Sequence, residues 1–119
     1  MRYMMLIQPD LENSPADGMP SQAVMDEMGK LLEEMTKSGV LLDTAGLKPN
    51  EEAVRVVSDH GKLSVVDGPF TESKEMVGGY LVVQVKSKDE ALEWANRFLK
   101  AHGEEWAIAV EVREIMEDV

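Results

Sequence analysis

Cysteine is absent from this chain of 119 residues, and histidine occurs only twice. Without cysteine the protein has no disulfide, no thiolate nucleophile, no iron–sulfur cluster and no cysteine zinc site. His60 and His102 lack the H-x-x-x-H spacing that places two imidazoles on one helix face. We therefore expect no bound metal or other cofactor. We expect His60 to occupy a hairpin turn and His102 to stabilise the last turn of a helix.

Long hydrophobic runs and positive charge are also scarce. The apolar runs are too short to span a membrane, and the strand-like start of the chain shows no signal-peptide cleavage site before Gln8. A cytoplasmic location is the default expectation. Lys and Arg total 12 against 23 Asp and Glu, a formal net charge of -11. Such a chain should repel phosphate backbones and anionic lipid, so we expect no nucleic-acid or membrane partner. The acidity is interpreted as serving solubility.

The composition fits one globular domain over residues 1–119, since 44% of the residues are hydrophobic and 29% are charged. Two common motifs are missing, one that binds nucleotides and one that carries a nucleophilic serine. Gly78-Gly79 does not belong to a G-x-G-x-x-G pattern, and no G-x-S-x-G occurs. We interpret the glycine pair as a bulge or as close backbone packing at the start of a strand.

Hydrophobic periodicity predicts strands over residues 2–8, 40–47, 53–57, 62–66, 77–85 and 106–115. One helix should begin after an N-cap at Ser21 and end at Gly39. A second should begin after Ser87, with Glu90 reaching back to the cap amide, and end near Gly103. The apolar stripes of the two helices are Val24, Met25, Met28, Leu31, Leu32 and Met35, and Ala91, Leu92, Ala95, Phe98 and Leu99.

This element order predicts an α+β fold, a ferredoxin-like split βαβ sheet with an inserted β-hairpin. Both helices should cover the same face of the sheet. The strand at 77–85 has apolar side chains on both of its sides, so roughly several hundred Å² of apolar sheet would otherwise face water. We expect a second copy to cover that face, giving a homodimer in the form of a dimeric α+β barrel.

A carboxylate cluster lies between two predicted strands. Asp67, Glu72 and Glu75 surround the segment Gly68-Pro69-Phe70. A carboxylate held beside a proline-fixed turn and a Phe ring can sit in a partly dry pocket, which suits general acid–base catalysis. Alternatively, Asp67 accepts hydrogen bonds from backbone amides of the following turn and is structural.

The segment DGPFTESKE at 67–75, followed by Gly78-Gly79-Tyr80, resembles the signature of the DGPF-domain group within the YCII-related family. Further matches extend over essentially the whole chain and comprise Arg2-Tyr3-Met4, Gly46-Leu47, residues 91–95 and residues 110–113. The resemblance implies a ferredoxin-like dimeric α+β barrel whose biochemical role is generally unassigned. Some members are encoded beside, or fused to, extracytoplasmic-function sigma factors, which implies a regulatory or stress-linked setting.

Related YCII proteins carry a histidine on the first helix and an aspartate, proposed as an acid–base pair. This chain departs from that pattern. Aligning the helix ends at Gly39 places Met28 near the histidine position, and the first predicted helix contains no histidine. The resemblance therefore does not carry that pair over to this chain.

Two hypotheses follow. In the first, each half of the barrel holds a small-molecule site lined by Tyr3, Asp67, Phe70, Glu72 and Tyr80, with Asp67 as the candidate catalytic residue. In the second, the protein is a non-catalytic regulatory or interaction module that binds a protein such as a sigma factor. An ordered ligand or cavity touching Asp67 favours the first hypothesis, whereas a filled barrel interior favours the second.

Overall fold

The computed structural model describes residues 1–15, 19–48, 50–68 and 76–117. The mixed α+β content predicted from the sequence is confirmed. In chain order the elements are β1 (Arg2–Pro9), η1 (Leu11–Asn13), α1 (Gln22–Lys37), β2 (Leu41–Gly46), η2 (Asn50–Glu52), β3 (Val54–Asp59), β4 (Lys62–Asp67), β5 (Gly79–Gln84), α2 (Lys88–His102) and β6 (Ile108–Glu114), where η marks a short 3-10 helix.

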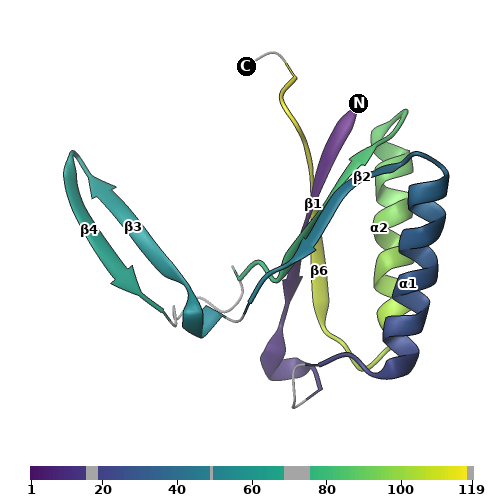
Figure 1. Cartoon of the computed structure of the whole chain (residues 1–119), viewed down its shortest axis with the longest axis horizontal. Coiled ribbons are helices and arrows are strands. Elements are labelled where there is room, and N and C mark those ends of the chain that lie inside the picture. The colour runs from purple at the N-terminus through teal and green to yellow at the C-terminus, as the bar shows by residue number, and fades with distance from the viewer. Residues whose placement is uncertain (16–18, 49, 69–75, 118–119) are drawn as a thin grey trace.

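Four strands form one antiparallel sheet in the order β2-β5-β1-β6, and β3 and β4 form a separate two-stranded sheet. Each βαβ unit is split, because β5 lies between β1 and β2 while β1 lies between β5 and β6. This is the split βαβ order predicted from the sequence. Figure 1 shows α1 and α2 side by side against one face of the larger sheet. We call the other face the open face.

Both helices begin at the predicted serine caps. The Ser21 hydroxyl accepts from a backbone amide of α1 at 3.3 Å, and the Ser87 hydroxyl accepts from the Glu90 amide at 3.1 Å. The predicted return contact of Glu90 is wrong in detail, since its carboxylate accepts from the amide of Lys86 at 3.0 Å rather than from the cap residue. Gly39 ends α1 with φ 78°, as predicted. Neither helix is long and apolar enough to cross a membrane, a finding made for the described residues.

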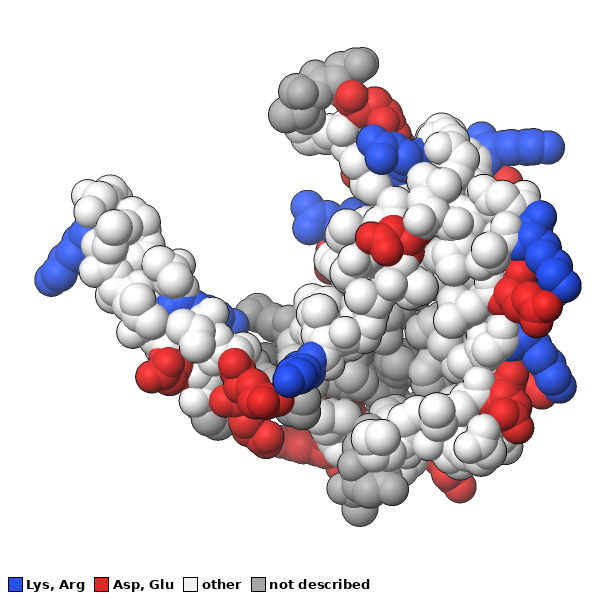
Figure 2. Space-filling view, in the orientation of Figure 1, with Lys and Arg blue, Asp and Glu red and all other residues white. Residues whose placement is uncertain are grey.

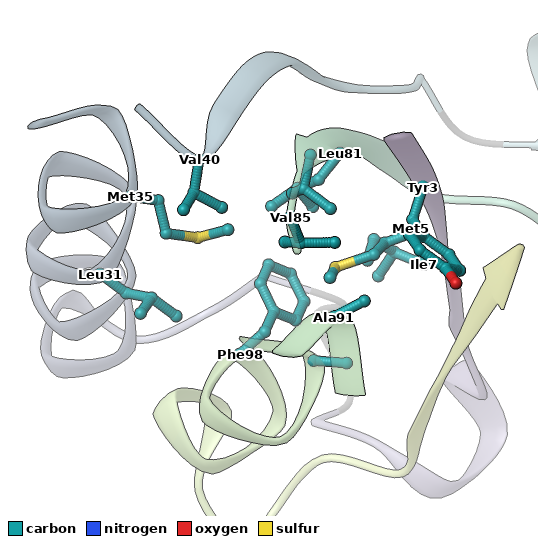
Figure 3. Close-up of a cluster of buried hydrophobic side chains, with 12 residues drawn as sticks. Tyr3, Met5, Ile7, Leu31, Met35, Val40, Leu81, Val85, Ala91 and Phe98 are labelled. Atoms are coloured by element: carbon teal, nitrogen blue, oxygen red, sulfur yellow. The ribbon is translucent and has the colours of Figure 1, made fainter. Parts of the chain in front are cut away.

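The hydrophobic core lies between the helices and the sheet (Figure 3). Met5, Met35 and Val83 are its largest fully buried side chains. The predicted helix stripes are too wide by one residue each, because Met25 and Leu92 are 52% and 39% exposed. Each of these two follows a residue that faces the core more directly, so it lies at the side of the helix rather than beneath it.

The outer sides of α1 and α2 are joined by an ion pair. Both terminal nitrogens of the Arg97 guanidinium donate to the Glu34 carboxylate, with Nη2 2.9 Å from Oε1. These hydrogen bonds and the positive charge lower the pKa of Glu34, and burial opposes them. The Arg97 guanidinium also lies 4.9 Å from the centroid of the Trp94 ring. The pair links the helices at a surface where ion pairs add little stability.

The hairpin β3–β4, which we call the arm, projects away from the rest of the molecule (Figure 1). The radius of gyration is 16.0 Å, against about 13.5 Å for a compact chain of this length. Every residue of both strands is exposed. The turn consists of His60 and Gly61, with φ 54° and 91°, so it is shorter than the predicted turn over 58–61 and the strands are correspondingly longer.

Candidate functional site

A cavity of ≈ 190 Å³ lies between the sheet and the helices, beside β2 and the beginning of β5. One wall consists of apolar side chains, and the other consists of two strand segments, 44–46 and 78–80. The apolar wall is formed by Ile7, Met28, Leu32, Leu81 and Phe98. Side chains of this kind, with few polar groups nearby, are typical of a small-molecule site.

Two glycines that face each other border this space. Gly46 of β2 and Gly79 of β5 are direct cross-strand partners, and Gly79 is also paired with Ile7, whose side chain is buried beneath the helices. Since partners across a sheet share a face, both glycines lie on the helix side and neither provides a side chain there. A Cβ atom on Gly46 would meet no heavy atom within 4 Å, so the lack of a side chain there leaves open space at this wall.

The glycines also allow the strands to approach closely. A Cβ atom on Gly79 would lie 2.8 Å from the Ala45 carbonyl oxygen, and one on Gly78 would lie 3.1 Å from the Pro9 ring. The interpretation of Gly78-Gly79 as close backbone packing is confirmed. Hydrogen bonds fix the same wall, because the Gly78 amide donates to Ile7 O at 2.7 Å and the Thr44 hydroxyl donates to a backbone carbonyl of β5 at 2.9 Å.

The two tyrosines of the predicted site point to opposite faces of the sheet. Tyr3 is paired with Val83 and is 4% exposed in the core (Figure 3). Its hydroxyl donates to Glu114 at 3.3 Å. Tyr80 borders the cavity through its strand, but its ring lies on the open face, where the hydroxyl donates to Asp43 at 3.0 Å. The structure therefore does not bring Tyr3 and Tyr80 together on one face.

The carboxylate cluster is only partly described by the structure. Asp67 is the last residue of β4 in the arm, where it pairs with Val54, and it is not among the residues that border the cavity. Phe70, Glu72 and Glu75 lie outside the described residues. The catalytic and the structural interpretations of Asp67 both stay predictions.

Both phenols are held in the neutral form. The hydrogen bond to Asp43, followed by the charge of that carboxylate, raises the pKa of Tyr80. Burial first, and then the charge of Glu114, raises the pKa of Tyr3. Since an unperturbed tyrosine already titrates near pH ~10, neither phenol provides a phenolate at neutral pH.

Asp43→Asn should lower the pKa of Tyr80, because the substitution removes the negative charge that opposes phenol ionisation. An alkaline spectrophotometric titration in a Tyr3→Phe background follows Tyr80 alone, since the chain has only these two tyrosines. Glu114→Gln in the same background is the matched control, because Glu114 faces Tyr3 on the other side of the sheet. An unchanged or higher Tyr80 pKa in Asp43→Asn would contradict the assigned pair.

Neither histidine borders the cavity. His60 forms the tip of the arm, with Nδ1 2.7 Å from Asp59 Oδ1. His102 lies in the last turn of α2, with Nδ1 3.0 Å from the Phe98 carbonyl and its ring beside those of Phe98 and Trp106. Both predicted positions, in a turn and at a helix end, are confirmed. In the part of the chain that the structure describes, no group of three or more acidic or histidine side chains is arranged to hold a metal.

Apart from Tyr80, the cavity-lining residues were not identified from the sequence as site residues. Met28, Leu32 and Phe98 were identified as core positions, and Met28 also as the residue near the histidine position of related YCII proteins. A signal was available, because a helix stripe packed over two glycines from neighbouring strands leaves space beneath it. Using that signal requires the pairing of Gly46 with Gly79, which depends on the strand register.

Comparison with known proteins gives three findings. The YCII-related domain profile matches residues 1–117. An uncharacterised protein of Rhizobium meliloti (strain 1021), R00369, is 31% identical over 81 residues, which span 68% of this chain and 65% of that relative. Among solved structures, 5-chloro-2-hydroxyhydroquinone dehydrochlorinase (TftG) from Burkholderia phenoliruptrix AC1100, in complex with 2,5-dihydroxybenzoquinone, superposes with a TM-score of 0.50 at 16% identity, over 98% of this chain and 94% of that chain. The similarity to the TftG structure supports the fold described above.

Proposed function

Because this chain belongs to the YCII-related domain family, we propose that it is a homodimer that binds a small molecule in the cavity beside Gly46 and Gly79. The observation that carries the proposal is the cavity itself, a mostly apolar space of ≈ 190 Å³ bordered by the pair Gly46 and Gly79. A concave, mostly apolar pocket with few polar groups is the kind of site that binds small molecules.

The cavity is suited to one substituted ring. An apolar cavity of about 150 Å³ accepts benzene, so this one has room for a ring with small substituents. The side-chain hydroxyls of its lining residues belong to Thr44 and Tyr80, and that of Tyr80 lies on the open face. The Thr44 hydroxyl donates to Tyr80 O and keeps lone pairs for a donor on the ligand. The quinone named in the TftG complex is also a single ring, but no reaction is transferred from that protein.

The proposed site binds its ligand with no histidine among the residues that line the cavity. Met28 borders the cavity, and it is the residue that falls near the histidine of other YCII proteins when the helix ends are matched at Gly39. A thioether accepts no proton at neutral pH, so it contributes packing rather than acid–base catalysis. Asp67 stays the candidate acid–base carboxylate, and that role requires it to reach a bound ligand from the end of β4.

The open face supports the proposed homodimer. Its centre is apolar and partly exposed, and charged side chains are found toward its margins. The central side chains are Met4, Leu6, Tyr80 and Val82, and the outer ones include Arg2, Asp43, Glu111 and Arg113. Two such faces stacked about a twofold axis would cover each other.

Phenol and catechol should bind in the cavity with a dissociation constant of about 1 mM or tighter. In a protein carrying ¹³C-methyl methionine, either probe should shift the methyl resonance of Met28, which borders the cavity, and leave that of Met25, which is 52% exposed on the same helix. Met28→Trp should fill the cavity and weaken binding at least tenfold, about 1.4 kcal/mol.

Met25→Trp is the matched control for this experiment and should bind like the wild type. Binding that shifts Met25 but not Met28, or that survives Met28→Trp unchanged, would place the site elsewhere. The absence of saturable binding by either probe would count against an aromatic ligand of this size.

A further inference from the structure

The two faces of the arm differ in polarity. The cross-strand register places four large apolar side chains on one face: Val54, Val56, Leu63 and Val65, exposed by 55%, 74%, 72% and 67%. The other face carries Arg55, Val57, Asp59, Lys62, Ser64 and Val66, among which Asp59 and Lys62 are cross-strand partners of opposite charge. A sheet with one apolar and one largely polar face is typical of burial on one side only.

Among the described residues, no element buries the strands of the arm, since every residue of β3 and β4 is exposed. An isolated two-stranded hairpin is marginally stable in water, and it requires a third strand or a packed face for independent stability. The turn of His60 and Gly61 fixes the register, since both residues have the positive φ that tight hairpins need. The turn fixes the pairing of the two strands but leaves the valines of the arm exposed to solvent. The apolar face of the arm is therefore available to a partner, since every residue of β3 and β4 is exposed in the described part of the chain.

We infer that the apolar face of the arm packs against a second copy of this chain, reciprocally about a twofold axis, so that each arm clasps the other protomer. The inference rests on the proposed homodimer and adds a contact to it. The reason for choosing a second copy is that each protomer has two uncovered apolar surfaces, the arm and the centre of the open face. A symmetric dimer covers both at once.

The areas of the arm and of the open face also favour a second copy of the chain as the partner. A strand of six residues is about 20 Å long and neighbouring strands lie about 5 Å apart. The arm thus offers a flat area of about 200 Å², and the four-stranded open face offers about 400 Å². A stable interface buries about 800 Å² per partner. The open face alone falls well short of that value, whereas the two surfaces together, with the relief of their side chains, approach it.

The distribution of charge permits this contact despite a net charge of -11. Figure 2 shows mostly uncharged atoms over the displayed side of the arm, with acidic residues gathered toward its base. Asp67 is the one acidic residue among the strand residues on the apolar face of the arm, and it lies at the base of the arm. Repulsion between protomers is therefore kept away from Val56 and Leu63.

Neighbouring valines on opposite faces of β3 provide a matched test. Val56→Glu places a charge on the apolar face, and Val57→Glu places the same charge on the other face. Sedimentation equilibrium of the wild type at micromolar concentration should give twice the chain mass of 13.2 kDa. Val56→Glu should weaken the dimer by about 100-fold or more, because it buries an unpaired charge. Val57→Glu should stay within about threefold of the wild type.

The outcomes separate the inference from the proposal on which it rests. A monomeric wild type overturns both the clasping arm and the homodimer. A dimer that tolerates Val56→Glu but is dissociated by Val82→Glu, on the open face, overturns the arm contact and retains the homodimer. Unchanged far-UV circular dichroism shows that a variant is folded, and probe shifts at the Met28 methyl report the cavity independently of assembly.

Discussion

Met35→Ala should lower the free energy of unfolding by about 3 kcal/mol, within the ~2–5 kcal/mol range for deleting a large buried side chain. Met35 is 1% exposed and lies in the core beside Val40 (Figure 3). The substitution removes three heavy-atom groups and leaves a cavity that the surrounding strands cannot fill without moving. Urea unfolding at a fixed protein concentration measures the loss, because concentration affects the apparent stability of a dimer.

The matched control is Met25→Ala, ten residues earlier in the same helix. Met25 is 52% exposed, so its truncation should change stability by no more than about 0.5 kcal/mol. The two variants make the same chemical change in the same helix and differ in burial. Equal losses would show that helix propensity rather than core packing sets the cost, and would contradict the described position of α1.

Gly79→Ala should destabilise the protein by about 2–3 kcal/mol, since overpacking against a rigid neighbour is costly. The added methyl would lie 2.8 Å from the Ala45 carbonyl oxygen, and this oxygen belongs to the backbone of β2. A backbone atom cannot rotate away as the end of a side chain can. The strands β2 and β5 would have to separate, so the loss should appear in thermal unfolding together with weaker binding of ring probes.

Gly46→Ala is the control within the same pair of strands. Gly46 is the cross-strand partner of Gly79, yet a Cβ there would meet no heavy atom within 4 Å. Replacing glycine by alanine without strain reduces the entropy of the unfolded chain, so stability should be unchanged or higher by up to about 1 kcal/mol. A loss as large as that of Gly79→Ala would contradict the described register between β2 and β5.

Short-range features of the fold were predictable because they depend on neighbouring residues. The caps at Ser21 and Ser87, the end of α1 at Gly39 and the turn at His60 each follow from side-chain or backbone properties within a few positions. The coverage of only one sheet face also followed, since the split βαβ order places both crossover helices together. These features define most of the element order.

Features that depend on register or on a second surface were not predictable in this way. The predicted site combined Tyr3 and Tyr80, but a one-residue change of register moves a side chain to the other face of a sheet. The cavity depends on Gly46 meeting Gly79 across 33 positions of sequence. The hairpin itself was predicted, whereas its projection from the body was not, because an apolar strand face is compatible with packing on any nearby surface.

The position of β1 affects how the chain folds during synthesis. β1 is translated before every other strand, yet its partners in the sheet are β5 and β6, which are translated last. Its backbone groups stay unpaired until residues 79–84 and 108–114 have left the ribosome. Such long-range pairing slows folding, and an unpaired strand edge can associate with another nascent chain. The sheet is therefore completed only after β6 has emerged from the ribosome.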